Sequence, residues 1–107
     1  MSENLFFELI KKYGEDFNWI ETKNDVFVNQ LNLELDKTHL LYARVKKALA
    51  KCESNDDVLF LLDNNDFAIV HLTYSTKNAN GFPKHKYFSN LPSAISYIEQ
   101  QFVSEFM

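Results

Sequence analysis

The sequence predicts an α+β fold: a small antiparallel β-meander of about three strands packed with about four helices. Two apolar runs, VLFLL at 58–62 and FAIV at 67–70, flank the turn-forming residues 63–66, as in an antiparallel hairpin. Neither run alternates cleanly between apolar and polar residues, so we expect both faces of this hairpin to be covered, as in central strands. Apolar residues at helical spacing before and after the hairpin predict the helices that cover it.

Length and charge restrict the class of protein. A chain of 107 residues forms a single domain, over residues 1–107, because it cannot supply two independent cores. Its net charge of −4 repels phosphate backbones, so we expect no nucleic-acid partner. No apolar run approaches the ~20 residues of a membrane helix, and the N-terminus lacks a signal-peptide pattern. Since Cys52 is the only cysteine, no internal disulfide can form, and we expect a cytoplasmic protein without a membrane partner.

The N-terminal segment predicts a helix that begins after Ser2, a good N-cap, and ends at Gly14, a natural C-terminal stop. Its apolar stripe is formed by Leu5, Phe6, Leu9 and Ile10. A short connection follows and carries Trp19, the only tryptophan in the chain. We interpret Trp19 as a lid on the core rather than a ligand-stacking residue, and keep it as a candidate aromatic anchor for a partner.

Residues 25–35 are compatible with two structures. The stretch LNLEL alternates as a strand does, whereas Phe27, Leu31 and Leu35 lie on one face of a helix. Asn24 precedes the segment and is a suitable N-cap. We therefore favour the helix.

Residues 41–52 predict an amphipathic helix that ends near residues 54–55. Its apolar positions recur at helical spacing and are Leu41, Val45, Ala48, Leu49 and Cys52. Because Cys52 continues this stripe, we interpret it as a small buried hydrophobe rather than a reactive thiol.

Residues 84–88 (KHKYF) predict a third, edge strand, since lysines there discourage strand addition by another chain. The same run interleaves bases with aromatics, as single-strand binders do, but three basic positions are few in an acidic chain. Residues 89–90 then cap a final helix, with Pro92 tolerated in its first turn. Its apolar face is formed by Leu91, Ala94, Ile95, Ile98 and Phe102.

His71 is the one imidazole within the apolar hairpin strands. A buried imidazole needs a hydrogen-bond partner, so we interpret His71 as a satisfied histidine of the core or rim, with interface, ligand and catalytic roles as alternatives. A ligand-binding or enzymatic site would use a pocket of His39, His71, Thr73 and Ser75. Ser75 lies about 13 Å from His71 along an extended strand, so these two cannot form a nucleophile–base pair directly.

The sequence predicts no metal site and no cofactor. The side chains that bind zinc lack the short paired spacings of zinc sites; they are His39, His71, His85 and Cys52. Two glycines in the whole chain are too few for a glycine-rich phosphate loop.

Acidic residues gather at the ends of the predicted hairpin. Ordinary solvated turns explain them, or they form a docking surface for a basic partner, where such charges speed encounter and set register. On the second interpretation, the steering residues are Asp56, Asp57, Asp63 and Asp66. Trp19 and Tyr74 are then the aromatic anchors.

Several motifs resemble a set of short, mostly uncharacterised bacterial proteins: HLLY at 39–42, DDVLF at 56–60 and VHLTYS at 70–75. In that set, H-x-L-Y, D-D-V-L-F and V-H-L-T-[WY]-S stretches occur in this order, and the resemblance covers residues 36–90. No catalytic activity is established for the set, so the resemblance implies no catalytic residue.

In size, acidity and α+β architecture, the chain is also similar to immunity proteins of contact-dependent growth inhibition and related polymorphic toxin systems. This similarity implies a non-enzymatic protein that binds one cognate toxin domain, expected to be a nuclease, and occludes its active site. It carries over no site residues. A structural domain that forms a homodimer through residues 84–88 is a further alternative, so we expect a monomer or a homodimer.

Overall fold

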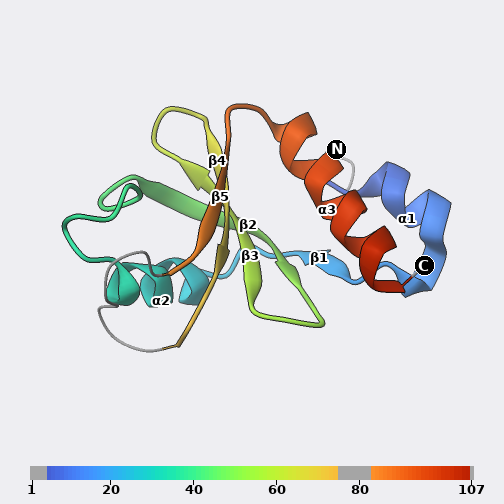
Figure 1. Cartoon of the computed structure of the whole chain (residues 1–107), viewed down its shortest axis with the longest axis horizontal. Helices are drawn as coiled ribbons and strands as arrows, with labels where there is room; N and C mark the ends of the chain where they lie inside the picture. The colour runs from blue at the N-terminus through green and yellow to red at the C-terminus, as the bar shows by residue number, and fades with distance from the viewer. Residues whose placement is uncertain (1–4, 75–82, 107) are drawn as a thin grey trace.

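The computed structural model describes residues 5–74 and 83–106 (Figure 1). These residues form an α+β domain with a five-stranded antiparallel sheet and three α-helices. Each strand pairs with its neighbours in sequence, in the order β1-β2-β3-β4-β5, so the sheet is a meander. The predicted fold class is confirmed. The prediction was about three strands and about four helices, whereas the described residues form five strands and three α-helices.

The elements in chain order are α1 (Phe7–Tyr13), the 3₁₀ turn η1 (Gly14–Asp16), β1 (Trp19–Glu21), α2 (Val26–Glu34), β2 (Val45–Cys52), β3 (Asp57–Leu62), β4 (Phe67–His71), β5 (His85–Phe88) and α3 (Leu91–Phe106). None of the helices in the described part of the chain is both long and apolar enough to cross a membrane.

The predicted hairpin is confirmed as β3 and β4, and β3 is the central strand of the sheet. Figure 1 shows α1 and α3 side by side towards one end of the molecule and α2 towards the other. Helix α3 packs on β4 and β5, and α2 packs on β2. Successive residues of β3 therefore enter opposite apolar clusters: Leu59 faces α1 and α3, whereas Val58 and Phe60 face α2.

Two apolar clusters fill the two faces. The cluster beneath α1 and α3 consists of Phe6, Leu9, Phe17, Trp19, Ala50, Cys52, Leu59, Ile69, Ala94, Ile98 and Phe102. The cluster beneath α2 consists of Leu31, Leu35, Leu41, Ala48, Val58, Phe60, Leu62, Ala68, Val70 and Leu72. Cys52 is buried, as the interpretation of a small core hydrophobe requires.

The helix predicted over residues 41–52 is wrong, because residues 45–52 form β2. The pairing of β2 with β3 shifts register twice, between Val45 and Lys47 and again between Ala48 and Ala50. Each β-bulge inserts one residue and turns the following side chains to the other face. Ala48 thus enters the α2 cluster, while Ala50 enters the other cluster. Two such shifts give a β-strand an apolar spacing that imitates a helix.

The helices predicted over residues 25–35 and after residues 89–90 are confirmed as α2 and α3, whereas α1 begins at Phe7, so Leu5 and Phe6 precede the helix instead of belonging to its stripe. Helix α1 ends at Gly14, whose φ of +66° is a conformation that glycine adopts without strain. Helix α2 occupies the segment that was compatible with either structure, and Asn24 Oδ1 accepts a hydrogen bond from the Val26 N–H at 2.9 Å, although Asp25 holds the N-cap position. Asn90 Oδ1 accepts one from the Ser93 N–H at 2.9 Å, at the start of α3. Ser2 lies outside the described residues.

Both edges of the sheet are short strands. The predicted edge strand at residues 84–88 is confirmed as β5, which pairs only with β4 in the described residues. The opposite edge, β1, was predicted as a connection. Its three residues are too few to show a strand pattern, and its pairing of Trp19 with Cys52 depends on β2 being a strand.

Candidate functional site

The four predicted steering residues lie at the two ends of the β3–β4 hairpin. Asp63 and Asp66 lie in the turn between the strands, while Asp56 and Asp57 lie where β3 begins. The six residues of β3 separate the pairs by about 20 Å. The hairpin therefore carries two acidic groups rather than a single rim.

At the turn, a network of hydrogen bonds fixes the side chains that we call the tip cluster: Arg44, Asp63, Asn64, Asp66 and Tyr87. Arg44 donates from Nε to Asp63 Oδ1 at 3.2 Å, and from Nη2 to Asn64 Oδ1 at 3.1 Å and to the Tyr87 hydroxyl at 2.9 Å. The Tyr87 hydroxyl in turn donates to Asp66 Oδ2, which also accepts from Asn64 Nδ2 at 3.0 Å. The hydrogen bonds to Tyr87 and Asp63 raise the pKa of Arg44 above its ordinary value.

Backbone contacts hold the tip cluster in place. The Asp63 N–H donates to the Arg44 carbonyl at 2.8 Å, which joins the turn to the residue before β2. Asn65 takes a φ of +64°, a left-handed conformation that asparagine tolerates better than most residues. Because the side chains are already ordered, a partner that binds them loses less conformational entropy.

The tip cluster has the composition of a protein-binding surface. Tyrosine and arginine dominate the energetics of many interfaces, and Tyr87 is 37% exposed in the cluster. Tyr42 is 44% exposed and lies two residues before Arg44. Two carboxylates against one guanidinium leave the cluster net negative. Sequence reasoning named Asp63 and Asp66 but missed Arg44 and Tyr87, which come from the two segments flanking the hairpin.

At the other end of the hairpin, Asp57 Oδ1 lies 2.9 Å from His71 Nδ1, and the two residues are directly opposite in the β3–β4 ladder. His71 is an exposed rim histidine, satisfied by a carboxylate. Tyr74 is 50% exposed, and burial of its hydroxyl, followed by the charges of Asp56 and Glu34, raises its pKa.

A shallow groove of about 250 Å³ opens beside His71. Its lining combines acidic, basic and aromatic side chains and consists of Asp57, Ile69, His71, Lys84, His85, Lys86 and Tyr97. Lys86 Nζ lies 5.7 Å from the centre of the Tyr97 ring, a cation–π contact between β5 and α3.

Of the residues of the predicted pocket, His39, His71, Thr73 and Ser75, the structure describes the first three, and each of them contacts a different partner. His39 Nε2 lies 3.0 Å from the Pro83 carbonyl oxygen, and its ring packs on His85 with centroids 4.8 Å apart. Burial, and then the charge of His39, lowers the pKa of His85. Thr73 binds Glu34. Ser75 lies outside the described residues, and within them no histidine, cysteine, aspartate and glutamate side chains group as a metal site.

Sequence reasoning also missed Glu34, a carboxylate at the end of α2 that is 0% exposed. It accepts hydrogen bonds from Gln30 Nε2 at 2.8 Å, the Thr73 N–H at 2.8 Å, the Thr73 hydroxyl at 2.7 Å and the Tyr74 N–H at 2.9 Å. Burial alone would raise the pKa of Glu34, but these hydrogen bonds outweigh it and lower the pKa. An ionised Glu34 therefore fastens the chain that leaves β4, where Tyr74 takes a φ of +59°.

Trp19, one of the two candidate aromatic anchors, is buried in the core. It is 6% exposed and packs against Phe6, with ring centroids 6.1 Å apart. Its ring belongs to the core beneath α1 and α3, which agrees with the lid interpretation and leaves too little surface for a partner.

Comparison of the chain with protein-family models, with curated proteins and with solved structures finds no match. Function is therefore inferred from the geometry and charge of the surface.

Proposed function

We propose that this chain is an immunity-type protein: it binds a cognate bacterial toxin domain, a nuclease, and neutralises that domain by occluding its active site. The observation that carries this proposal is the tip cluster, in which Asp63 and Asp66 are held in fixed positions at the exposed end of the hairpin. The proposal places the protein in the cytoplasm, where such a toxin meets its nucleic-acid substrate.

The charge of the tip cluster suits a nuclease. An enzyme that cleaves nucleic acid has a cationic groove for the phosphates, and two ordered carboxylates can occupy the positions of those phosphates. The net charge of −4 adds long-range attraction that speeds encounter. Asp56 and Asp57 contribute to this steering from the far end of the hairpin, while contact is assigned to Asp63 and Asp66.

The tip cluster also offers the apolar area that charge alone does not supply. Tyr87 presents an exposed ring within the cluster, where its hydroxyl binds Arg44 and Asp66. Tyr42, two residues before Arg44 in the sequence, is also exposed. A standard interface buries about 800 Å² on each partner. We assign this contact to the turn, β5 and the segment before β2. Tyr74 lies at the other end of the hairpin and is not assigned to this contact.

Growth protection tests the proposal. Cells that express the toxin domain encoded beside this gene should survive when they also express the wild-type chain and should die with the double variant Asp63→Lys/Asp66→Lys. The matched control is Glu15→Lys/Asp16→Lys, which changes the net charge equally on η1 and should still protect. Two results would contradict the proposal. In the first, both double variants protect the cells; in the second, the wild-type chain and the control variant both fail to protect them.

The groove beside His71 favours a second candidate, a small ligand-binding or enzymatic domain. A carboxylate bound to Nδ1 fixes the tautomer of an imidazole, which is how many enzymes orient a general base, and Lys84 and Lys86 supply positive charge for an anion. Titration with inorganic phosphate, followed through the backbone amide NMR resonances of Ile69 and Tyr97 in the lining of the groove, distinguishes the candidates. Saturable shifts that His71→Gln and Lys86→Gln abolish would favour this ligand site, and their absence would eliminate it.

A further inference from the structure

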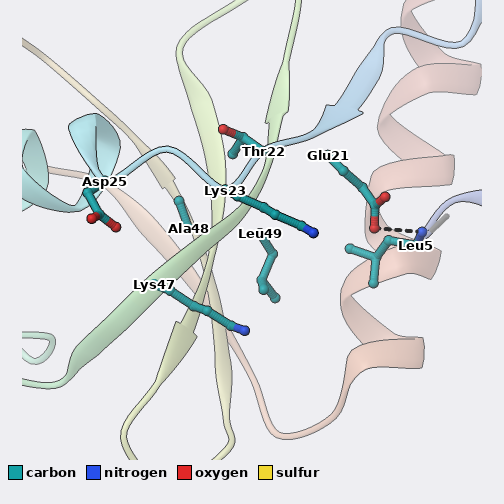
Figure 2. Close-up of a pocket in the computed structure, with 8 residues that line it drawn as sticks. All are labelled: Leu5, Glu21, Thr22, Lys23, Asp25, Lys47, Ala48 and Leu49. Carbon is teal, nitrogen blue, oxygen red and sulfur yellow. Dashed lines mark hydrogen bonds between the residues drawn. The ribbon is translucent and has the colours of Figure 1, made fainter. Parts of the chain in front are cut away.

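A pocket of about 370 Å³ lies where β1 ends beside β2, and it belongs to neither the tip cluster nor the groove beside His71 (Figure 2). Its volume is in the range of sites that take small molecules. Six of its lining residues carry the argument: Leu5, Glu21, Lys23, Lys47, Ala48 and Leu49.

The pocket exists because β1 is shorter than β2. The β1–β2 ladder pairs Glu21 with Ala50, and the Thr22 N–H then donates to the Leu49 carbonyl at 3.0 Å. Beyond this point the chain departs towards α2, while β2 continues to Val45. The second β-bulge of β2 lies at the same place, between Ala48 and Ala50. Because backbone hydrogen bonds between β1 and β2 border this pocket, the pocket is formed before a ligand binds.

The floor of the pocket is apolar. Leu5 and Leu49 are partly buried and pack against the cluster beneath α1 and α3. An apolar floor that is already anchored to the core can accept the hydrocarbon part of a ligand without rearrangement.

The rim of the pocket carries two ammonium groups, of Lys23 and Lys47, and two carboxylates, of Glu21 and Asp25. Figure 2 shows the ammonium groups of Lys23 and Lys47 extending from different segments, with the Leu49 side chain between them. Glu21 Oε1 accepts the Leu5 N–H at 2.9 Å, so this carboxylate is engaged with the backbone. Asp25, at the start of α2, is well separated from both ammonium groups in the same view.

We propose that this pocket binds a small amphipathic carboxylate. Its apolar body lies against Leu5 and Leu49, and its carboxylate lies between Lys23 and Lys47. Two ammonium groups over an apolar floor select a ligand that carries both a negative charge and hydrocarbon, and they disfavour a neutral or purely polar one. The site shares no residue with the tip cluster, so it does not depend on toxin binding.

Octanoate is a suitable probe, followed by NMR of the isotopically labelled full chain. Saturable shifts should appear at the amides of Thr22, Ala48 and Leu49. The double variant Lys23→Gln/Lys47→Gln should weaken binding on the order of tenfold, because two ion pairs at a surface are lost. Lys11→Gln/Lys37→Gln, which removes two exposed lysines outside the pocket, should leave the affinity unchanged.

Octanamide, the uncharged relative of the probe, separates charge from apolar contact and should bind about tenfold more weakly than octanoate. Three results would overturn the proposal: no saturable shift, equal affinity of the two double variants, or equal affinity for octanoate and octanamide. Thermal unfolding midpoints of the variants show whether any loss reflects a change of fold instead.

Discussion

Glu34 Oε1 accepts hydrogen bonds from both the backbone N–H and the hydroxyl of Thr73, at 2.8 and 2.7 Å, and so joins the end of α2 to the chain leaving β4. The other carboxylate oxygen, Oε2, accepts from Gln30 and from the Tyr74 N–H. A buried charge is tolerated here because donors surround it. This contact fixes the residues that lead away from the Asp57–His71 end of the hairpin.

Glu34→Gln should destabilise the fold by about 2 to 3 kcal/mol, because the amide NH₂ would face backbone and hydroxyl donors that now share a carboxylate. Chemical denaturation in urea measures the change. Glu8→Gln, an exposed position on α1, is the matched control and should change the free energy of unfolding by less than about 0.5 kcal/mol. Equal effects of the two substitutions would show that the Glu34 network contributes no stability.

The same carboxylate predicts a dependence of stability on pH. Folding lowers the pKa of Glu34, so ionised Glu34 contributes fully to the stability of the fold above its ordinary pKa of 4.5. This contribution to stability is lost as the pH falls through the pKa that Glu34 has in the folded protein. The difference in unfolding free energy between wild type and Glu34→Gln should therefore be constant near neutral pH and shrink in acid. Glu99, whose pKa the hydrogen bonds from Tyr13 and Lys12 lower, is common to both proteins and cancels. A difference that stays constant or widens in acid would contradict the assignment.

Ala43 takes a φ of +60° in the turn before β2, a conformation that costs an L-residue about 1 to 2 kcal/mol. Ala43→Gly should stabilise the fold by roughly 0.5 to 1 kcal/mol, since relief of strain exceeds the added chain entropy of glycine. Ala50→Gly, in the buried part of β2, should instead destabilise by about 1 to 2 kcal/mol. Urea denaturation should therefore show changes of opposite sign in the free energy of unfolding of the two variants. A loss of stability in both variants would argue against the left-handed conformation of Ala43.

Tyr87→Phe tests the preorganisation of the tip cluster. The change removes the hydroxyl that accepts from Arg44 and donates to Asp66 but keeps the aromatic ring. Affinity for the toxin domain should fall about three- to tenfold, while the free energy of unfolding changes by less than about 1 kcal/mol because the cluster is at the surface. Tyr42→Phe, whose hydroxyl lies outside the network, is the control. Equal affinities of the two variants would show that the order of the cluster does not matter for binding.

The sequence was sufficient to predict the elements whose signals are local. The hairpin, α2 and α3 follow from apolar runs, turn residues and capping side chains that are close in sequence. Strand β2 was mistaken for a helix because its bulges break the period of two, and bulges arise from pairing with β3 rather than from β2 itself. Strand β1 has three residues and no pattern of its own.

The site was predictable only in part for the same reason. Asp63 and Asp66 stand out as turn acids, but Arg44 and Tyr87 reach them from 19 and 21 residues away in sequence. Glu34 gave a weak signal, since it occupies a position on the apolar stripe of α2 with Phe27 and Leu31. A charged residue on such a stripe is a candidate for a buried, satisfied side chain.

Calorimetric titration of the purified chain with the nuclease toxin domain that we propose as its partner tests the central proposal most directly. Asp63→Lys/Asp66→Lys and Glu15→Lys/Asp16→Lys have the same net charge, so any difference between them reports the position of the carboxylates rather than their number. We predict that Asp63→Lys/Asp66→Lys binds the toxin domain at least about tenfold more weakly than Glu15→Lys/Asp16→Lys, and that the affinity of Asp63→Lys/Asp66→Lys depends less on salt. Equal dissociation constants for the two variants would contradict the account.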